Sequence, residues 1–242
     1  RKLIKLPDDQ LNTGHYVMIM GSAFVGAISY TFSDSFWFSA VEGEVYAMSS
    51  MFTAIVFWAM LKWEHHADER HSDRWLILIA YLMGLSIGVH LLNLLTIPAL
   101  AYIYYFKRHK VTTSGIVKTG IMGVAILGII QYAIIQGFVK IGAYFDLFFV
   151  NTLGMPFWTG FLFFVLLIVA AIVFGLNYTV KKNKPLWNTA VLCFAFIVLG
   201  YASYAQVVIR SLANPPMDEN NPENAFALLS YLNREQYGDR PL

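Results

Sequence analysis

The chain is built from long apolar runs joined by short polar links. Six runs stand out. They lie at about 16–31, 45–63, 75–106, 115–138, 157–179 and 186–209. Crossing the hydrocarbon core of a bilayer takes about 20 apolar residues in a helix. Five of the runs fit that length, whereas 75–106 is too long for one ordinary span. The pattern predicts an all-α, polytopic transmembrane bundle.

The positions of Lys and Arg indicate how the long run is divided. Segments 1–13, 62–74, 107–118 and 181–184 hold 3, 3, 4 and 3 of them, or 13 of the 17 in the chain. Basic residues collect in cytoplasmic loops. A single crossing by 75–106 would put two of these clusters on opposite faces. Two short helices meeting near Gly88–Asn93 put all four inside. This arrangement predicts about seven spans with a cytoplasmic N-terminus, and it makes 32–44, 140–156 and 210–242 the outer segments.

The broken pair and the C-terminal tail carry further expectations. Non-helical backbone at membrane depth needs cover from protein or a water-filled cavity, so the break is expected to line a cavity open to the outer face. Residues 1–210 are predicted to form the transmembrane domain. Residues 211–242 are predicted to form a tail on the outer side, with a short amphipathic helix from Pro222 to about Arg234. That helix either lies on the outer surface or begins a soluble domain.

Acidic residues lie between the first two runs. Asp34, Glu42 and Glu44 stand there among aromatic side chains, with no Lys or Arg between them, and Tyr46 follows. Such carboxylates can bind a metal, a cation or a hydroxyl-rich substrate. Glu44 and Glu42 are the candidate catalytic acids, with Glu44 favoured because it leads into the second run. Asp34 and Tyr46 are candidate binding residues. The alternative is an acidic loop in outer-side water.

Four more candidates lie further along the chain. His90 and Asn93 stand at the break, three apart and so on one helical face, where a histidine can donate to a phosphate or relay a proton. The alternative is a histidine that satisfies loose backbone groups. Arg210 ends the last run on the outer side, where its planar guanidinium can bind two oxygens of a phosphate. The alternative is that the side chain extends to the lipid headgroups. Asn214, four residues further on, is also a candidate substrate-binding residue.

Composition supports the membrane interpretation. The chain is 57% hydrophobic and 13% charged, against about 25% charged in an average soluble domain. Its net charge of +2 comes from short clusters between apolar runs, so nucleic acid is not an expected partner. The single Cys193 excludes a disulfide within the chain. Glu42 and Glu44 could ligate a divalent metal ion, although nothing in the pattern requires one.

Four segments of the chain are distinctive: 36–49 (FWFSAVEGEVYAMS), 82–93 (LMGLSIGVHLLN), 209–216 (IRSLANPP) and 231–239 (YLNREQYGD). They resemble a bacterial membrane-protein family that is similar to protein O-mannosyltransferases, which have the GT-C fold. It implies transfer of a sugar, mannose in the first instance, from a polyprenyl-phosphate carrier to Ser or Thr of exported proteins at the bacterial inner membrane. A carboxylate would take the hydroxyl proton, and cationic groups would hold the leaving phosphate.

One departure from that family qualifies the expectation. Its first outer loop has an Asp–x–Gly–Glu sequence and a His–Pro–Pro element, and neither occurs here. The chain is therefore expected to be the middle segment of a longer protein, with the main catalytic acid outside it, or a protein that has lost that acid. In either case Glu42 and Glu44 would be supporting acids. Two other functions stay open. A transporter or flippase would also use broken helices, and a non-catalytic scaffold subunit would explain the missing loop.

Overall fold

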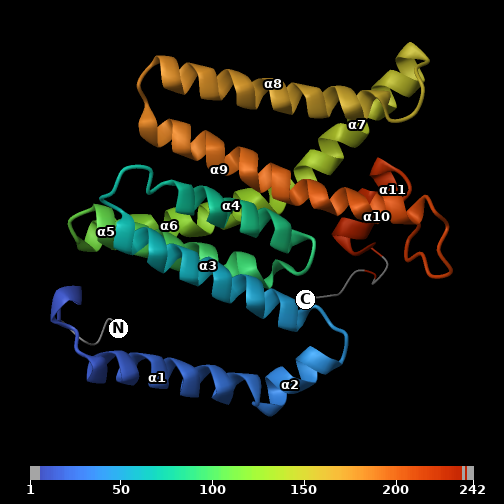
Figure 1. Ribbon diagram of the computed structural model, residues 1–242. Helices are drawn as coiled ribbons and strands as arrows, with labels where there is room; N and C mark the ends of the chain where they lie inside the picture. Colours follow the sequence, from blue (N-terminus) through green and yellow to red (C-terminus); the bar gives the residue numbers. More distant parts are fainter. Residues whose placement is uncertain (1–5, 236–237, 239–242) are drawn as a thin grey trace. The chain divides into compact units, whose positions relative to one another are not determined.

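The computed structural model describes residues 6–235 and residue 238, and every regular element in those ranges is a helix (Figure 1). The chain divides into two compact units, 1–48 and 49–242. The all-helical class predicted from the apolar runs is therefore confirmed for the described residues. Four basic residues used in predicting the topology lie outside them: Arg1, Lys2, Lys5 and Arg240. Part of the last resemblance segment, 231–239, does so too.

The first unit consists of a short 3-10 helix, η1 (Asp8–Gln10), and two α-helices, α1 (Thr13–Thr31) and α2 (Asp34–Val41). A capping box begins α1: Asn12 Oδ1 accepts the backbone N–H of His15, and His15 Nδ1 accepts that of Asn12. The axes of α1 and α2 meet at a bend of 62°. No residue of α1 is buried, so its apolar side chains need lipid or further protein around them.

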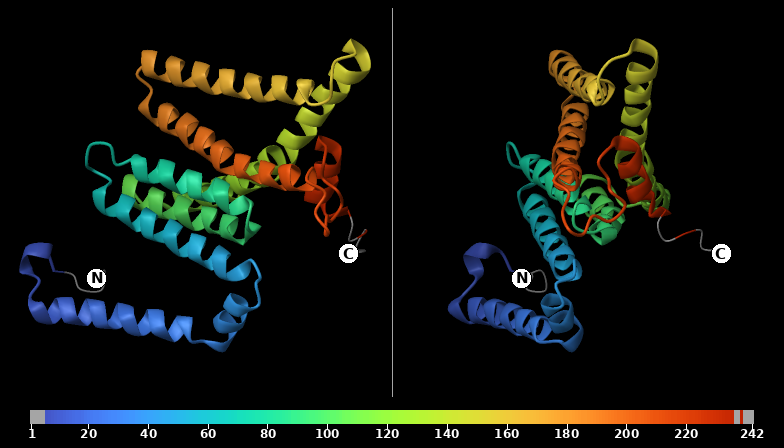
Figure 2. Two further views of the ribbon diagram at one scale, coloured as in Figure 1. Left: turned by 45° about the vertical axis from the view of Figure 1, so that its right-hand side comes forward. Right: turned by 90° about the vertical axis from the view of Figure 1, so that its right-hand side faces the viewer.

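The second unit is a helical bundle, except that the first turn of its first helix belongs to the first unit. Its elements are α3 (Tyr46–His66), α4 (Arg74–Ile87), η2 (Leu91–Thr96), α5 (Ile97–Arg108), α6 (Thr113–Gly128), the π-helical η3 (Ile129–Gln136), α7 (Gly137–Leu153), α8 (Thr159–Lys181), α9 (Pro185–Tyr201), η4 (Ala202–Tyr204), α10 (Ala205–Ser211) and α11 (Ala225–Asn233). The main pairs are α4 with α9, α5 with α6 and α7 with α8 (Figures 1 and 2).

Within the described residues, three helical stretches are long and apolar enough to cross a membrane: Thr113–Leu153, Thr159–Lys181 and Pro185–Ser211. The bent pair α1–α2 makes a fourth if it counts as one span. The predicted count of seven is therefore not confirmed. One reason is length, because α4 and α5 have only 14 and 12 residues. The expected outer loop at 140–156 was wrong, since α7 continues as helix through Leu153.

The predicted break in the long run is confirmed. α4 ends at Ile87, and the chain then passes through Gly88–His90 and the 3-10 helix η2 before α5 begins at Ile97. At about 1.5 Å per residue, the two halves are about 21 and 18 Å long, each shorter than about 30 Å of hydrocarbon. They form a hairpin that starts and ends at the same end of the unit.

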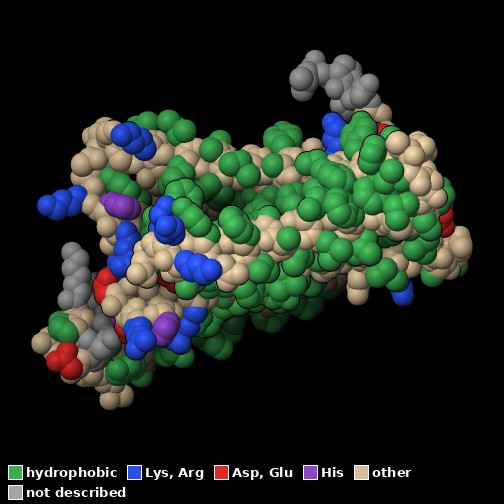
Figure 3. Space-filling model, turned by 90° about the horizontal axis from the view of Figure 1, so that it is seen from above, with side chains coloured by type: hydrophobic (Ala, Val, Ile, Leu, Met, Phe, Trp, Pro, Cys, Tyr) green, Lys and Arg blue, Asp and Glu red, His purple; other side chains and the backbone are tan. Residues whose placement is uncertain are grey.

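Side-chain contacts bring three of the four basic clusters to that end. Lys107 Nζ lies 3.0 Å from an Asp68 carboxylate oxygen, and this hydrogen bond and charge hold the pKa of Asp68 below its ordinary value. Arg108 donates to the carbonyl oxygen of Ala67 at 2.6 Å. Thr189 Oγ1 donates to Asp73 at 2.6 Å, which ties in the start of α9. Figure 3 shows most of the visible Lys and Arg at one end, with hydrophobic side chains between the ends.

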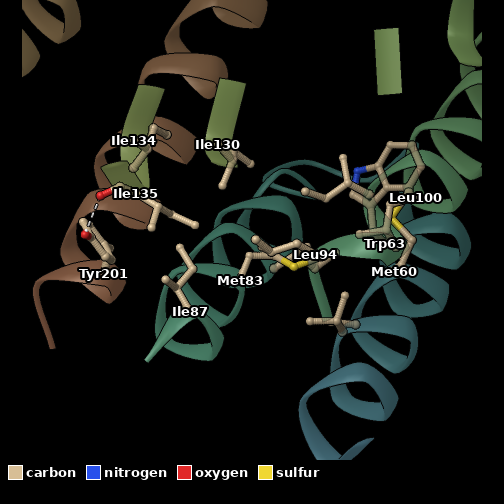
Figure 4. Close-up of a cluster of buried hydrophobic side chains, with 14 of the residues drawn as sticks. Met60, Trp63, Met83, Ile87, Leu94, Leu100, Ile130, Ile134, Ile135 and Tyr201 are labelled. Atoms are coloured by element: carbon tan, nitrogen blue, oxygen red, sulfur yellow. Dashed lines mark hydrogen bonds between the residues drawn. The ribbon is translucent and has the colours of Figure 1, made fainter. Parts of the chain in front are cut away.

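The core of the second unit lies between α3, the α4–η2–α5 hairpin and the π segment (Figure 4). Trp63 and Met60 are almost completely buried. The Trp63 ring stacks on Tyr104 with the ring centroids 5.1 Å apart. These contacts fix the position of the hairpin by close packing, which is what holds helices together where lipid surrounds them.

The π segment is stabilised by a hydrogen bond from another helix. A π turn disturbs the regular helical ladder, and here Tyr201 of α9 donates its hydroxyl to the carbonyl oxygen of Ile135 at 2.8 Å (Figure 4). We expect Tyr201→Phe to lower the free energy of unfolding by about 1 to 2 kcal/mol, because a buried carbonyl loses this partner. Chemical unfolding of the purified chain in detergent measures the change. Tyr132→Phe is the matched control, since Tyr132 is 71% exposed; equal losses in both variants would contradict the interpretation.

The chain after α10 has the predicted organisation, a helix break followed by a short helix. α10 ends at Ser211, ahead of the Pro215–Pro216 pair, and α11 begins at Ala225. The Asn224 side chain caps α11 by accepting two backbone N–H groups. α11 packs against α7 (Figure 2) and contributes Leu228 to the core. The predicted helix is thus confirmed, and it is an integral part of the second unit.

Candidate functional site

The acidic segment between α1 and α3 is open and aromatic. Asp34 lies in the first turn of α2, and Glu42 follows its last residue. Eight residues of helix at about 1.5 Å each put them about 12 Å apart along the axis, so Asp34 does not share a site with Glu42. Gly43, at φ +71°, turns the chain in the left-handed region that favours glycine, between Glu42 and Glu44.

The candidate side chains of this segment are all exposed. Asp34, Glu42, Glu44 and Tyr46 are open to the surroundings, and α3 starts at Tyr46, directly after the acids. Aromatic pairs flank them: Tyr30 with Phe36, at a centroid distance of 4.5 Å, and Phe32 with Trp37, at 5.8 Å. Aromatic belts of this kind mark the boundary between hydrocarbon and water. The aromatic pairs are thus typical of such a boundary, and the acids stay exposed beside them.

His90 has a different place from the one predicted. It caps η2 in an extended conformation, with φ −163°, and its Nδ1 accepts the backbone N–H of Leu92 at 3.1 Å. The expectation that His90 and Asn93 share a helical face is wrong, because α4 has already ended at Ile87. With Nδ1 accepting, the neutral ring carries its proton on Nε2.

Asn93 is fully buried at the centre of the break. Its Oδ1 accepts from Thr53 of α3 at 3.2 Å, and its Nδ2 donates to Ser86 of α4 at 3.0 Å. One side chain thus links α3, α4 and η2. In this arrangement Asn93 positions the break, and His90 is the member of the pair that reaches the surface.

α10 presents two different faces, and each lines a hollow. Arg210 lies on the face toward a polar pocket of about 310 Å³. The pocket is lined by Gln206, Val207, Arg210, Ser211, Pro215, Met217, Asp218, Glu219, Pro222 and Tyr231. Arg210 is exposed and makes no ion pair with any carboxylate in the described ranges. The guanidinium is therefore available to an anion.

The opposite face of α10 lines an apolar groove of about 550 Å³. Its walls come from α7, α8, α9 with η4, and α11. Ala205, Val208 and Ile209 are the contribution of α10, and Leu212, directly after it, also lines the groove. Because most of these helices belong to the stretches able to cross a membrane, the groove is suited to a hydrocarbon chain.

Asn214 has a backbone role. It lies just past α10 at φ +50°, a left-handed conformation that asparagine tolerates, and its N–H donates to the carbonyl oxygen of Ser211 at 2.9 Å. This turn leads the chain from α10 to the polar pocket. Asn214 does not itself line the pocket.

The structure brings the break and α10 together. A Cβ placed on Gly88 would lie 3.5 Å from Ser203 Oγ, so the end of α4 lies beside η4, which leads directly into α10. His90 and Arg210 therefore share the end of the second unit that is opposite the basic clusters. The acidic candidates at 34–46 belong to the first unit.

The sequence interpretation missed two groups of residues. Gln206, Asp218, Glu219 and Tyr231 complete the polar pocket with Arg210; the acids directly after the Pro215–Pro216 break were their signal. Asp146 of α7 also caps α8 by accepting the N–H groups of Trp158 and Gly160, both at 3.1 Å. An aspartate in an otherwise apolar helix was the signal there. No group of three or more potential metal-ligating side chains occurs in the described part of the chain.

These features define a polytopic helical membrane protein with an open acidic segment, and with a polar pocket and an apolar groove on opposite faces of α10. Residues 1–113 match the family model of the protein O-mannosyl-transferase TMEM260 N-terminal domain. This match confirms the predicted resemblance to protein O-mannosyltransferases and covers two of its four segments, 36–49 and 82–93. No curated protein and no solved structure matches the chain.

Proposed function

We propose that the chain is part of a membrane glycosyltransferase that moves a sugar, mannose in the first instance, from a polyprenyl-phosphate carrier to Ser or Thr hydroxyls of exported proteins. The observation that carries the proposal is the match of residues 1–113 to a protein O-mannosyltransferase domain. That segment includes the acids at Glu42 and Glu44 and the break at His90.

The chemistry assigns a role to each group. A Ser or Thr hydroxyl needs a base as it attacks the sugar, and a carboxylate at the membrane boundary can take its proton. Glu44 and Glu42 are two residues apart and exposed, so an incoming protein chain can reach them. The departing lipid phosphate needs positive charge, and Arg210 can supply it in a two-pronged hydrogen bond. His90 and Asn93, at the break, remain proposed substrate-binding residues.

The proposed setting follows from the charge pattern. The basic clusters would face the cytoplasm by the positive-inside rule. His90, Arg210 and the 211–242 tail would then lie on the periplasmic side of a bacterial inner membrane. We propose a GT-C-like arrangement with about seven spans, in which α4 and α5 form the short broken pair within a transmembrane domain at 1–210.

A glycosylation assay tests the proposal. Cells lacking the gene are complemented with wild type or Glu44→Gln, and the mass of an exported Ser/Thr-rich reporter is measured. We expect a sugar mass with wild type and at least a 100-fold lower transfer rate with Glu44→Gln, because removing a positioned base typically costs about 10²- to 10⁴-fold. The matched control is Asp9→Asn, an exposed acid of the same unit outside the acidic segment.

Two results would count against this assignment. Wild-type transfer by both Glu44→Gln and Glu42→Gln would remove the acids from the reaction. A reporter mass that does not differ between wild type and the knockout would exclude this transfer, and transport or a scaffold role would then be pursued.

A further inference from the structure

The two hollows beside α10 are separated by one seven-residue helix. Gln206 and Arg210 are four residues apart, so they lie on one face of it, and both line the polar pocket. Ala205 and Ile209 have the same spacing one residue earlier, and both line the apolar groove. A ligand with a polar head and a long apolar tail would place its two parts on the two faces of α10.

The polar pocket has a mixed chemistry that narrows the class of head group. Arg210 offers a guanidinium fork for a phosphate, but Asp218 and Glu219 line the same pocket. Two carboxylates would weaken the binding of a bare phosphate by charge repulsion. They would favour a head that also carries hydroxyl donors, because ionised carboxylates only accept hydrogen bonds. Gln206 and Tyr231 add an amide and an aromatic ring.

The floor of the pocket is held in place before any ligand binds. Ser211 Oγ donates to Asp218 Oδ2 at 2.7 Å and contacts Asn221 Oδ1 at 3.3 Å. Pro222 is among the fully buried side chains. The loop from α10 to α11 is therefore fixed at both ends and in its middle. A preformed pocket binds more tightly because less chain has to be ordered.

The groove has the chemistry of a tail site. Its lining is almost wholly apolar, with the Tyr204 and Trp158 rings at its walls. It is bounded by α8 and α9, whose outward side chains are exposed; Phe174 of α8, for example, is 72% exposed. In a bilayer those outward faces meet lipid, so a hydrocarbon chain can enter sideways without crossing water.

We propose that α10 divides a binding site for a lipid-linked glycosyl phosphate, with the sugar phosphate in the polar pocket at Arg210 and Glu219 and the prenyl tail in the apolar groove. This inference rests on the proposed function for the identity of the sugar donor. It adds a location in residues 138–231, outside the matched segment, and a recognition role for Gln206, Asp218, Glu219 and Tyr231.

Direct binding tests the proposal. The full chain is placed in phosphatidylcholine nanodiscs, and binding of a synthetic mannosyl-phosphoryl prenol of four isoprene units is measured by native mass spectrometry. We expect Arg210→Gln and Ala205→Trp each to weaken binding by at least tenfold, the first by removing the phosphate partner and the second by filling the groove. Ala205 is exposed, so the tryptophan does not disturb the core.

Each variant has a matched control. Arg70→Gln removes the same charge from an exposed loop at the basic end. Ala170→Trp adds the same ring to an exposed position of α8 outside the groove lining. Wild-type affinity is expected for both controls. Equal affinity of all four variants would overturn the proposal.

Two competitor lipids separate the possible sources of the head group. The prenyl phosphate without sugar is expected to bind at least tenfold more weakly than the mannosylated probe, and Glu219→Gln is expected to reduce that difference. Equal binding of the two, or equal competition by phosphatidylglycerol, would identify an ordinary anionic-lipid site and overturn the proposal.

The assay contains no acceptor protein, so its outcome is separate from that of the transfer assay. Binding that depends on Arg210 without any transfer in cells would support this site and reject the proposed reaction. Transfer in cells with binding unaffected by Arg210→Gln and Ala205→Trp would support the reaction and reject this site.

Discussion

Replacing Gly200 with alanine is expected to lower the free energy of unfolding by about 3 kcal/mol, because overpacking in a close contact costs about that much. α4 and α9 cross where Gly84 faces Gly200. A Cβ on Gly200 would lie 2.5 Å from the carbonyl oxygen of Tyr81 and 2.6 Å from the backbone nitrogen of Leu85. These are backbone atoms of a helix, so they cannot move aside as a flexible side chain would. The two helices would have to separate.

The reciprocal variant and a control sharpen this prediction. Gly84→Ala is expected to cost a similar amount, since its Cβ would overlap the carbonyl oxygen of Ile197. Gly128 is also helical, but no atom lies within 4 Å of where its Cβ would be. Gly128→Ala should therefore be neutral or stabilising by up to about 1 kcal/mol. Unfolding in detergent, followed by circular dichroism, measures all three, and similar stability of the three variants would refute the close contact.

Replacing Asn93 with alanine is expected to cost about 2 to 3 kcal/mol. The side chain is fully buried and joins three elements. Thr53 and Ser86 each also donate to a carbonyl oxygen of their own helix, so their hydroxyls keep a partner. The expected loss comes from the cavity and from the two missing links between helices.

The Asn93→Ala substitution should also loosen the structure locally, around η2. Hydrogen exchange of the amides in η2 is expected to speed up in Asn93→Ala before that in α8 does, since local opening precedes global unfolding where contacts are fewest. Asn151→Ala is the matched control, because Asn151 is exposed on α7. Unchanged exchange in η2 would show that the break is held by packing alone.

The break itself could be predicted from the sequence, because two independent signals agreed on it. Run length excluded a single span for 75–106, and the charge clusters required a return to the same side. The geometry at His90 could not be predicted, since a 3-10 helix and a continued α-helix fit the same apolar pattern. Periodicity identifies a helix but does not locate the residue at which its hydrogen bonding changes.

Only one residue of the polar pocket, Arg210, could be predicted from the sequence. Arg210 stood out because a cation was unexpected there, and the structure places it in a pocket. Asp218, Glu219 and Tyr231 line the same pocket only because the loop after α10 folds back. The pattern of hydrophobic positions does not encode that fold. The predicted outer loop at 140–156 was wrong because the gap between two apolar runs set its bounds. In the structure α7 continues as helix through Leu153, and Asp146 caps the neighbouring α8 from within that helix.

The close pairing of α4 with α9 has a consequence for biogenesis. Gly84 and Gly200 are separated by 116 residues of chain, so at about 5–20 residues per second the ribosome needs about 6 to 23 s to deliver the partner of α4. During that interval the face of α4 that carries Gly84 has no partner from α9. The close contact between α4 and α9 therefore forms late, after the chain has been synthesised through Gly200.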